Sequence, residues 1–221
     1  MCGTATEFRD YAYPLSSCQE ATRRSWWRCR RLISTHALSP NWQSSYDLTL
    51  MIVLMAGLPG TGKTTLAREL AARTSGRVLS KDEIRHALFS PEEIEYSSRQ
   101  DDFCQQLMLE TAGYLLARNP ARLIFLDGRP FSRRYQIENV LAAAATLHQG
   151  WRILECVCSE ETARRRLERD AASNAHVAGN RNPGLYLEVQ SRFEAITLPK
   201  TVIDTDQPLE SCVQQALVAL G

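Results

Sequence analysis

A glycine-rich segment at residues 57–65 has the residue types and spacing that bind phosphate. Its sequence, GLPGTGKTT, matches the pattern GxxxxGK[ST] and lies between an apolar run and a helix-like segment. Glycines let the backbone curl around an anion with its N–H groups pointing inward, and a helix beginning near Gly62 adds the positive end of its dipole. Lys63 would then reach the β and γ phosphates of a nucleotide, and the Thr64 hydroxyl would ligate Mg²⁺. The expected nucleotide-binding residues are Gly57, Leu58, Pro59, Gly60, Thr61, Gly62, Lys63, Thr64 and Thr65.

A carboxylate that could share this metal follows a second apolar run. Asp127 comes directly after four apolar residues in RLIFLDG, at the predicted end of a strand. A carboxylate in that place can hold Mg²⁺ directly or through a water molecule. An Asp-Gly turn that closes the strand is the alternative interpretation, and it does not exclude the first.

The segment VLSKDEIRHAL bears on whether the phosphate is transferred or hydrolysed. Asp82 falls just past a predicted strand, at the edge of the sheet where doubly wound folds place their ligands. A carboxylate there could accept the proton of an attacking hydroxyl, and Arg85, one helical turn further on, could hold a polar or anionic substrate. Ser80 and Glu83 also match an S-x-x-E capping box, and Asp82 in the first turn favours the helix dipole. Spacing alone leaves both interpretations open.

The arginine-rich segment ETARRRLERD and the residues after it predict a helical lid over about 165–192. Arg165 and Arg169 share one helix face, and Arg166 flanks them. A polar segment containing glycine and proline follows, and then a second amphipathic helix. Such a lid would close over a triphosphate and exclude water, and its arginines would stabilise the transferring charge. Alternatively, the arginines complement the carboxyl end of the helix dipole and pair with neighbouring glutamates.

Composition excludes several classes of protein. Lys and Arg total 26 against 25 Asp and Glu, a net charge of +1, so no field of the whole chain favours nucleic acid or a membrane surface. The seven Cys and four His show no metal-ligand spacing, which favours reduced structural thiols. No apolar run approaches the ~20 residues of a membrane span. We therefore expect a cytoplasmic protein.

Strand and helix patterns alternate from residue 51 onward. The strands are predicted at 51–56, 77–80, 122–126, 151–158 and 201–204. The helices are predicted at 63–73, 82–89, 92–118, 133–148, 160–171, 185–196 and 208–220. This alternation implies an α/β fold with a five-stranded, mainly parallel sheet and helices on both faces, the three-layer P-loop NTPase architecture, here with a helical lid.

The segments GLPGTGKTTLA, SKDEIR, LIFLDGRPFSRRYQ and ARRRLERD resemble the P-loop kinases grouped with the AAA_33-type ATP-binding proteins. That group is similar to zeta-toxin-like kinases, chloramphenicol phosphotransferase and the kinase domain of polynucleotide kinase. The resemblance covers roughly residues 51–221. It implies that Asp82 is the general base and that Arg85 contacts substrate.

The resemblance also assigns roles to other arginines. Arg129 and Arg133 follow Asp127, where relatives often contact substrate or phosphates. The phosphate clamp is expected among the three lid arginines, and Arg165 and Arg169 are taken as catalytic together with Lys63 and Asp82. The local basic set of Arg85, Arg129, Arg133 and Arg134 suggests an acceptor that carries negative charge.

Residues 1–50 differ from the rest of the chain. They hold three of the four Trp, three of the seven Cys and the basic aromatic cluster RRSWWRCRRL. We expect an irregular or disordered extension, or an upstream reading whose working start is Met51. A transit peptide is less favoured because acidic residues are present, and a nucleic-acid contact is ranked with it. The expected domains are thus 1–50, the extension, and 51–221, the P-loop kinase domain.

The leading hypothesis is a kinase that uses ATP and Mg²⁺ to phosphorylate a hydroxyl of a small-molecule or nucleotide-type acceptor, chiefly by positioning and electrostatics. A P-loop ATPase or switch acting through a protein partner is disfavoured, because the sequence has no N-K-x-D element and no room for the helical domain of ring-forming ATPases. A nucleic-acid 5′-end kinase is disfavoured by the near-neutral charge. The protein is expected to act as a monomer or homodimer, away from membranes.

Overall fold

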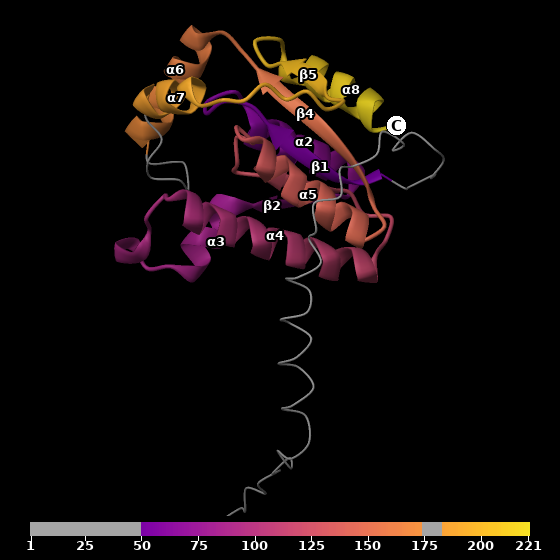
Figure 1. Ribbon diagram of the computed structural model, residues 1–221. Coiled ribbons are helices and arrows are strands. Elements are labelled where there is room, and N and C mark those ends of the chain that lie inside the picture. Colours follow the sequence, from indigo (N-terminus) through magenta and orange to yellow (C-terminus); the bar gives the residue numbers. More distant parts are fainter. Residues whose placement is uncertain (1–49, 174–182) are drawn as a thin grey trace, which may run out of the picture. The chain divides into compact units, whose positions relative to one another are not determined.

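The computed structural model describes residues 50–173 and 183–221. In these ranges, five strands form one sheet and helices cover both of its faces (Figure 1). Apart from Leu50, the residues of the expected amino-terminal extension lie outside the described ranges. So does 174–182, the central part of the expected lid.

The sheet is parallel throughout, in the strand order β2-β3-β1-β4-β5. Its strands are β1 (Leu50–Ala56), β2 (Arg77–Ser80), β3 (Ile124–Asp127), β4 (Gly150–Val157) and β5 (Thr201–Asp204). The predicted α/β fold is confirmed. Because β1 is the central strand, the glycine loop that follows it leaves the sheet between the ends of β3 and β4.

The described α-helices are α2 (Lys63–Thr74), α3 (Lys81–Leu88), α4 (Ser98–Arg118), α5 (Arg134–Thr146), α6 (Glu160–Ser173), α7 (Pro183–Ser191) and α8 (Leu209–Leu220). A short 3₁₀ turn, η1 (Pro91–Glu93), precedes α4. The predicted helix 92–118 is therefore wrong in its first turns. Tyr96 has a φ of 50° and Ser97 accepts the N–H of Gln100 at 3.2 Å, so the helix is capped at Ser97 and begins at Ser98.

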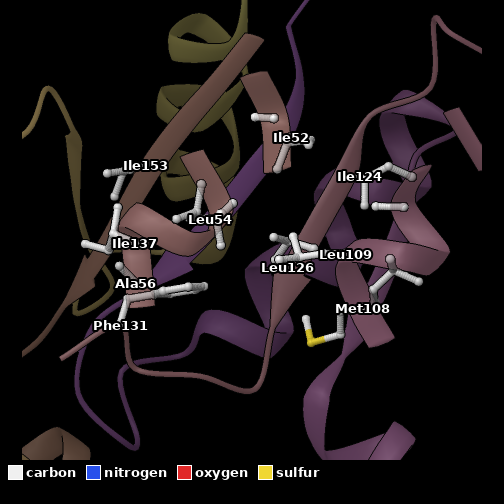
Figure 2. Close-up of a cluster of buried hydrophobic side chains, with 14 of the residues drawn as sticks. Ile52, Leu54, Ala56, Met108, Leu109, Ile124, Leu126, Phe131, Ile137 and Ile153 are labelled. Carbon is white, nitrogen blue, oxygen red and sulfur yellow. The ribbon is translucent and has the colours of Figure 1, made fainter. Parts of the chain in front are cut away.

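Apolar layers cover the two faces of the sheet. Ile52 and Leu54 of β1 face one layer, where residues of α4 and α5 pack against β1 and β3 (Figure 2). Val53 and Met55 point to the other face and pack against α2 and α8. Successive strand residues alternate between faces, so a strand covered on both sides is apolar throughout. Each fully buried aliphatic side chain of this kind contributes about 1.5–3 kcal/mol, which makes the sheet a rigid platform for the loops at its carboxyl edge.

The cysteines of the described ranges carry free thiols, and three of the four are buried. Burial raises the pKa of the Cys156 thiol to about 12, so this side chain acts as a small core hydrophobe. Among the described helices, none combines the length and apolar character needed to cross a bilayer.

Candidate active site

The glycine loop between β1 and α2 is packed against β4 and α6. Gly57, Gly60 and Gly62 have φ values of 126°, 79° and 80°. A Cβ on Gly57 would lie 2.2 Å from the Cys156 carbonyl oxygen, and one on Gly60 would lie 2.7 Å from that of Ala163. Glycine is therefore required at these two positions both by conformation and by the close approach of neighbouring backbone.

The side chain of Lys63 is folded over this loop. Its Nζ donates to the carbonyl oxygens of Gly57, at 2.9 Å, and Leu58, at 2.7 Å, and the residue is buried. Gly62 forms the left-handed N-cap of α2, and no side chain of the described residues caps this end. The first N–H groups of the helix and the ammonium are thus arranged around one place, where an anion would be stabilised.

Two glycine substitutions should separate close packing from backbone strain. We expect Gly57→Ala to destabilise the fold by about 1–3 kcal/mol from strain alone, and by more because its Cβ meets backbone. Gly62 also has a positive φ, but the Cβ of an alanine there would have its nearest neighbours at 3.5 Å. We therefore expect Gly62→Ala to lower the stability of the fold by only about 1–2 kcal/mol. Urea unfolding monitored by circular dichroism measures both. If both variants lose the same amount of stability, the close approach of the Gly57→Ala Cβ to the Cys156 carbonyl oxygen has no cost of its own.

A cavity that we call the α2 cavity has a volume of about 390 Å³ and lies beside the start of α2. Its lining includes Gly60, Gly62, Lys63, Thr64, Arg166, Arg169 and Thr205. Arg166 joins the loop to β5, because it donates to the Gly60 carbonyl at 3.3 Å and to the Thr205 carbonyl at 2.8 Å. The Thr205 hydroxyl donates in turn to the Thr61 carbonyl at 3.0 Å. This cavity is thus lined by the glycine loop and by cationic side chains, among them Arg166 and Arg169.

The structure places the lid arginines differently from one another. Arg169 lines the α2 cavity and Arg165 lines neither cavity, although both residues are exposed. The inward face of α6 is marked by Ala163 and Leu167, which pack with Leu58 of the glycine loop. Arg166 is three residues after Ala163 and shares that face, whereas Arg165 is turned away by about 100°. The apolar pair at i and i+4 was the sequence signal for Arg166.

The second cavity, which we call the α3 cavity, also has a volume of about 390 Å³. Its lining includes Lys63, Lys81, Asp82, Tyr96, Asp101, Gly128, Glu188 and Arg192. Lys63 lines both cavities. The two spaces therefore meet at the one side chain expected to touch the terminal phosphates.

Asp82 lies in the α3 cavity within a network of ion pairs. Arg85 Nη1 donates to Asp82 Oδ1 at 2.7 Å, and Arg85 Nη2 pairs with Asp101 Oδ1. Lys81 Nζ lies 2.7 Å from Asp101 Oδ1 and 3.5 Å from Asp82 Oδ1. Arg85 is fully buried and does not line the cavity. The structure thus brings Asp82 to the site and puts Arg85 behind it, where it can orient the carboxylate.

The alternative interpretation of residues 80–83 as a helix cap is confirmed for one of its two hydrogen bonds. Ser80 is the N-cap of α3 and accepts the N–H of Glu83 at 3.3 Å. The Glu83 carboxylate instead accepts from Arg68 at 3.3 Å, and the reciprocal bond of a capping box is not formed. Capping thus explains Ser80 and leaves the Asp82 carboxylate facing the cavity.

Asp127 ends β3 and is paired in register with Ser80 of β2. It is 1% exposed, and its Oδ1 finds no hydrogen-bond partner among the described residues. A buried carboxylate oxygen without a donor is costly unless a cation or water satisfies it. The described residues contain no group of three or more His, Cys, Asp or Glu that could hold a metal alone. Asp127 thus fits a Mg²⁺ ion that is bound chiefly by phosphates and by one or two protein ligands.

The two arginines after Asp127 have structural partners. Arg129 is 2% exposed and donates to Gln105 at 2.7 Å and to Asp102 at 2.5 Å, which fastens the loop after β3 to α4. Arg133 is half-exposed and pairs with Glu194 at 3.0 Å. Neither lines the α2 cavity or the α3 cavity, so the expected contact of these two arginines with substrate stays a prediction.

Sequence reasoning missed three residues that build the site. Asp101 and Asp102, side by side at the start of α4, hold Arg85 and Arg129 respectively. Thr205 directly follows β5 and lines the α2 cavity. Its position after a predicted strand was the available signal, because the carboxyl ends of parallel strands gather at one edge. The adjacent carboxylates offered no comparable signal.

Comparison with known proteins extends this picture. A provisionally assigned kinase of Chloroflexus aurantiacus J-10-fl superposes with a TM-score of 0.62 and 23% identity, covering 77% of this chain and 98% of that one. A gluconokinase of Sinorhizobium meliloti 1021 superposes with a TM-score of 0.56 and 16% identity, covering 79% of this chain and 93% of that one. The APS kinase CysC of Mycobacterium tuberculosis superposes with a TM-score of 0.56 and 16% identity, covering 78% of this chain and 98% of that one.

These likenesses show a fold shared with P-loop kinases. No curated protein matches the sequence significantly. The profile of the AAA_33 family, described as an AAA domain, matches residues 52–181, which include the glycine loop, Asp82 and Asp127. By this match over more than half of its length, the chain belongs to the AAA_33 family of AAA domains.

Proposed function

We propose that the protein is a kinase that transfers the γ-phosphoryl group of ATP to a hydroxyl of a small molecule. The observation that carries this proposal is the meeting of the α2 and α3 cavities at Lys63. ATP in the α2 cavity would place its terminal phosphates at the loop. The α3 cavity, within the usual size range of a small-molecule site, would hold the acceptor. The mycobacterial APS kinase has been solved in complex with AMPPNP and APS, so one protein of this fold binds two such ligands.

The described residues supply the parts of a phosphoryl transfer. The loop N–H groups and Lys63 hold the β and γ phosphates, and Arg166 and Arg169 approach from α6. Mg²⁺, with Thr64 and Asp127 as its proposed ligands, would neutralise charge that develops on the phosphates. Lys81 and Arg85 orient Asp82.

In the proposed step, Asp82 accepts the proton of the acceptor hydroxyl. The acceptor oxygen forms a bond to the γ phosphorus as the bond from that phosphorus to the β–γ bridging oxygen breaks. ADP leaves, and the phosphorylated acceptor carries the new P–O bond. Positioning across the two cavities is the main contribution of the protein.

Label transfer from γ-labelled ATP tests the proposal directly. The full chain is incubated with Mg²⁺ and a pooled panel of small hydroxyl compounds, nucleosides and 5′-OH oligonucleotides, and the products are separated by chromatography. We expect label on a small-molecule acceptor together with an equal amount of ADP. Label found only in free phosphate, at a rate that no acceptor changes, would contradict a kinase and favour an ATPase or switch.

Substitution of Asp127 tests its place beside the metal. We expect Asp127→Asn to raise the Mg²⁺ concentration for half-maximal activity about 10–100-fold, because the amide is neutral and the buried Oδ1 would be lost as an anionic ligand. Asp204→Asn makes the same change at the end of β5, where the aspartate is exposed and not buried, so it serves as the control. Neither aspartate lines the α2 or the α3 cavity. A Mg²⁺ titration of initial rates measures both. If both variants reach half-maximal activity at the same Mg²⁺ concentration, Asp127 is not a ligand of the metal.

A further inference from the structure

The charged side chains that line the α3 cavity balance one another. Lys63, Lys81 and Arg192 are cationic, and the anionic side chains are Asp82, Asp101 and Glu188. An anionic acceptor would gain from an excess of positive charge, and a cationic one from an excess of negative charge. The described lining supplies neither excess.

These charges are also already engaged with one another. Lys81 lies between Asp101 and Asp82, and Arg192 Nη1 lies 3.1 Å from Glu188 Oε1. Lys63 donates to carbonyl oxygens of the glycine loop. An anionic group that entered this cavity could obtain Lys81 only by breaking its largely buried pair with Asp101, which is costly. At Arg192 it would compete with Glu188 in an exposed ion pair.

The arginines that suggested an anionic acceptor lie elsewhere. Arg85 and Arg129 are buried in ion pairs with aspartates of α4. Arg133 pairs with Glu194, and Arg134 pairs with Glu138 at 2.7 Å on an exposed helix face. None of the four lines the α3 cavity. The structure removes the basis for the negative charge that the sequence suggested.

The remaining lining is suited to hydroxyl groups and to the apolar face of a ring. Ser98 and Tyr96 carry hydroxyls, and the carboxylate oxygens are hydrogen-bond acceptors. The Ser97 hydroxyl also lines the cavity, but it caps α4 and donates to Glu95 at 2.9 Å. Pro130 and Leu185 add apolar surface. The volume of about 390 Å³ is at the lower end of the ~300–1,000 Å³ range of small-molecule pockets.

We propose that the acceptor is an uncharged, polyhydroxylated molecule of the size of a sugar or cyclitol, seated in the α3 cavity. This inference rests on the proposed kinase function. It is carried by three observations: the equal numbers of cations and carboxylates in the lining, their existing pairing, and the hydroxyl and apolar groups between them.

Pairs of acceptors in which a carboxylate replaces one CH2OH group test the inference. The full chain, γ-labelled ATP and Mg²⁺ are combined with the pairs glucose and glucuronate, and sorbitol and gluconate, and with myo-inositol, nucleosides and a 5′-OH oligonucleotide. We expect kcat/KM to be at least about tenfold higher for the uncharged member of each pair. Preference for the acids, or transfer only to nucleosides or the oligonucleotide, would overturn the inference and leave the kinase function standing. If label reaches no acceptor in a Lys63-dependent way, the kinase function itself fails and the inference falls with it.

Two cavity variants and one surface variant sharpen this test. Glu188→Gln removes a negative charge from the cavity, so the ratio of kcat/KM for gluconate to that for sorbitol should rise about three- to tenfold. Arg192→Gln should lower the same ratio. Glu138→Gln removes an identical charge from an exposed surface outside both cavities and should leave the ratio unmoved. A ratio that responds equally to Glu138→Gln and Glu188→Gln would show that the acceptor is not bound beside Glu188.

Discussion

Replacing Lys63 with alanine should reduce phosphoryl transfer by about 10²–10³-fold or more, the usual cost of removing one preorganised donor from a transferring charge. The reason is its position, because Lys63 is the side chain that lines both cavities and its ammonium lies over the glycine loop. Both kcat and kcat/KM for ATP should fall, because the interaction strengthens as charge develops. Initial rates with saturating acceptor measure the effect.

The loss of stability caused by the same substitution is a separate effect, and a control is needed for it. The substitution removes two hydrogen bonds to carbonyl oxygens, each worth about 0.5–1.5 kcal/mol, or up to about 3 for a charged donor. Lys200→Ala is the matched control, because that side chain pairs with Glu155 at 2.5 Å and lies outside both cavities. It should cost some stability and leave transfer close to that of the unmodified protein. Near-normal phosphoryl transfer by Lys63→Ala would show that Lys63 of the glycine loop does not take part in the reaction.

Most elements of the fold could be predicted from the sequence because their signals are local. Strands 77–80 and 201–204 were placed at the residues where they occur, since short apolar runs flanked by helical patterns define them. The start of α4 was missed, although the residues before it favour a helix by composition. There, the side chain of Ser97 competes for the N–H of Gln100, and Tyr96 adopts a positive φ.

The glycine loop was predictable for the same reason, because its pattern lies within nine consecutive residues. The roles of arginines were not, since the fate of a long charged side chain depends on partners elsewhere in the chain. Arg129 is held by Asp102, which is 27 positions away, and Arg85 by Asp101, which is 16 positions away. The rotation of about 100° between consecutive helical residues decided between Arg165 and Arg166. The packing of Ala163 and Leu167 with Tyr186, Leu58 and Cys158 fixes that rotation.

Replacing Asp82 with asparagine should lower turnover by about 10²–10⁴-fold, the range for loss of a general base. Asn keeps the shape of the side chain and one oxygen that can accept a hydrogen bond. It is not basic, so it cannot take the proton from the hydroxyl that is being phosphorylated. Asp82 lines only the α3 cavity, so ATP affinity should change little. Steady-state rates and an equilibrium measurement of ATP binding together test this separation of chemistry from nucleotide binding.

The control for the capping interpretation lies two residues earlier. Ser80→Ala removes the N-cap of α3, so it should cost about 0.5–2 kcal/mol of stability with no comparable loss of turnover. Asp82→Asn also weakens a buried ion pair, but Arg85 keeps Asp101 and Gln100 as partners, so the helix should persist. Rates are therefore compared well below both melting temperatures. If Asp82→Asn lowers only the melting temperature while Asp101→Asn abolishes turnover, the base is the carboxylate on α4, and Asp82 belongs to the ion-pair network that supports it.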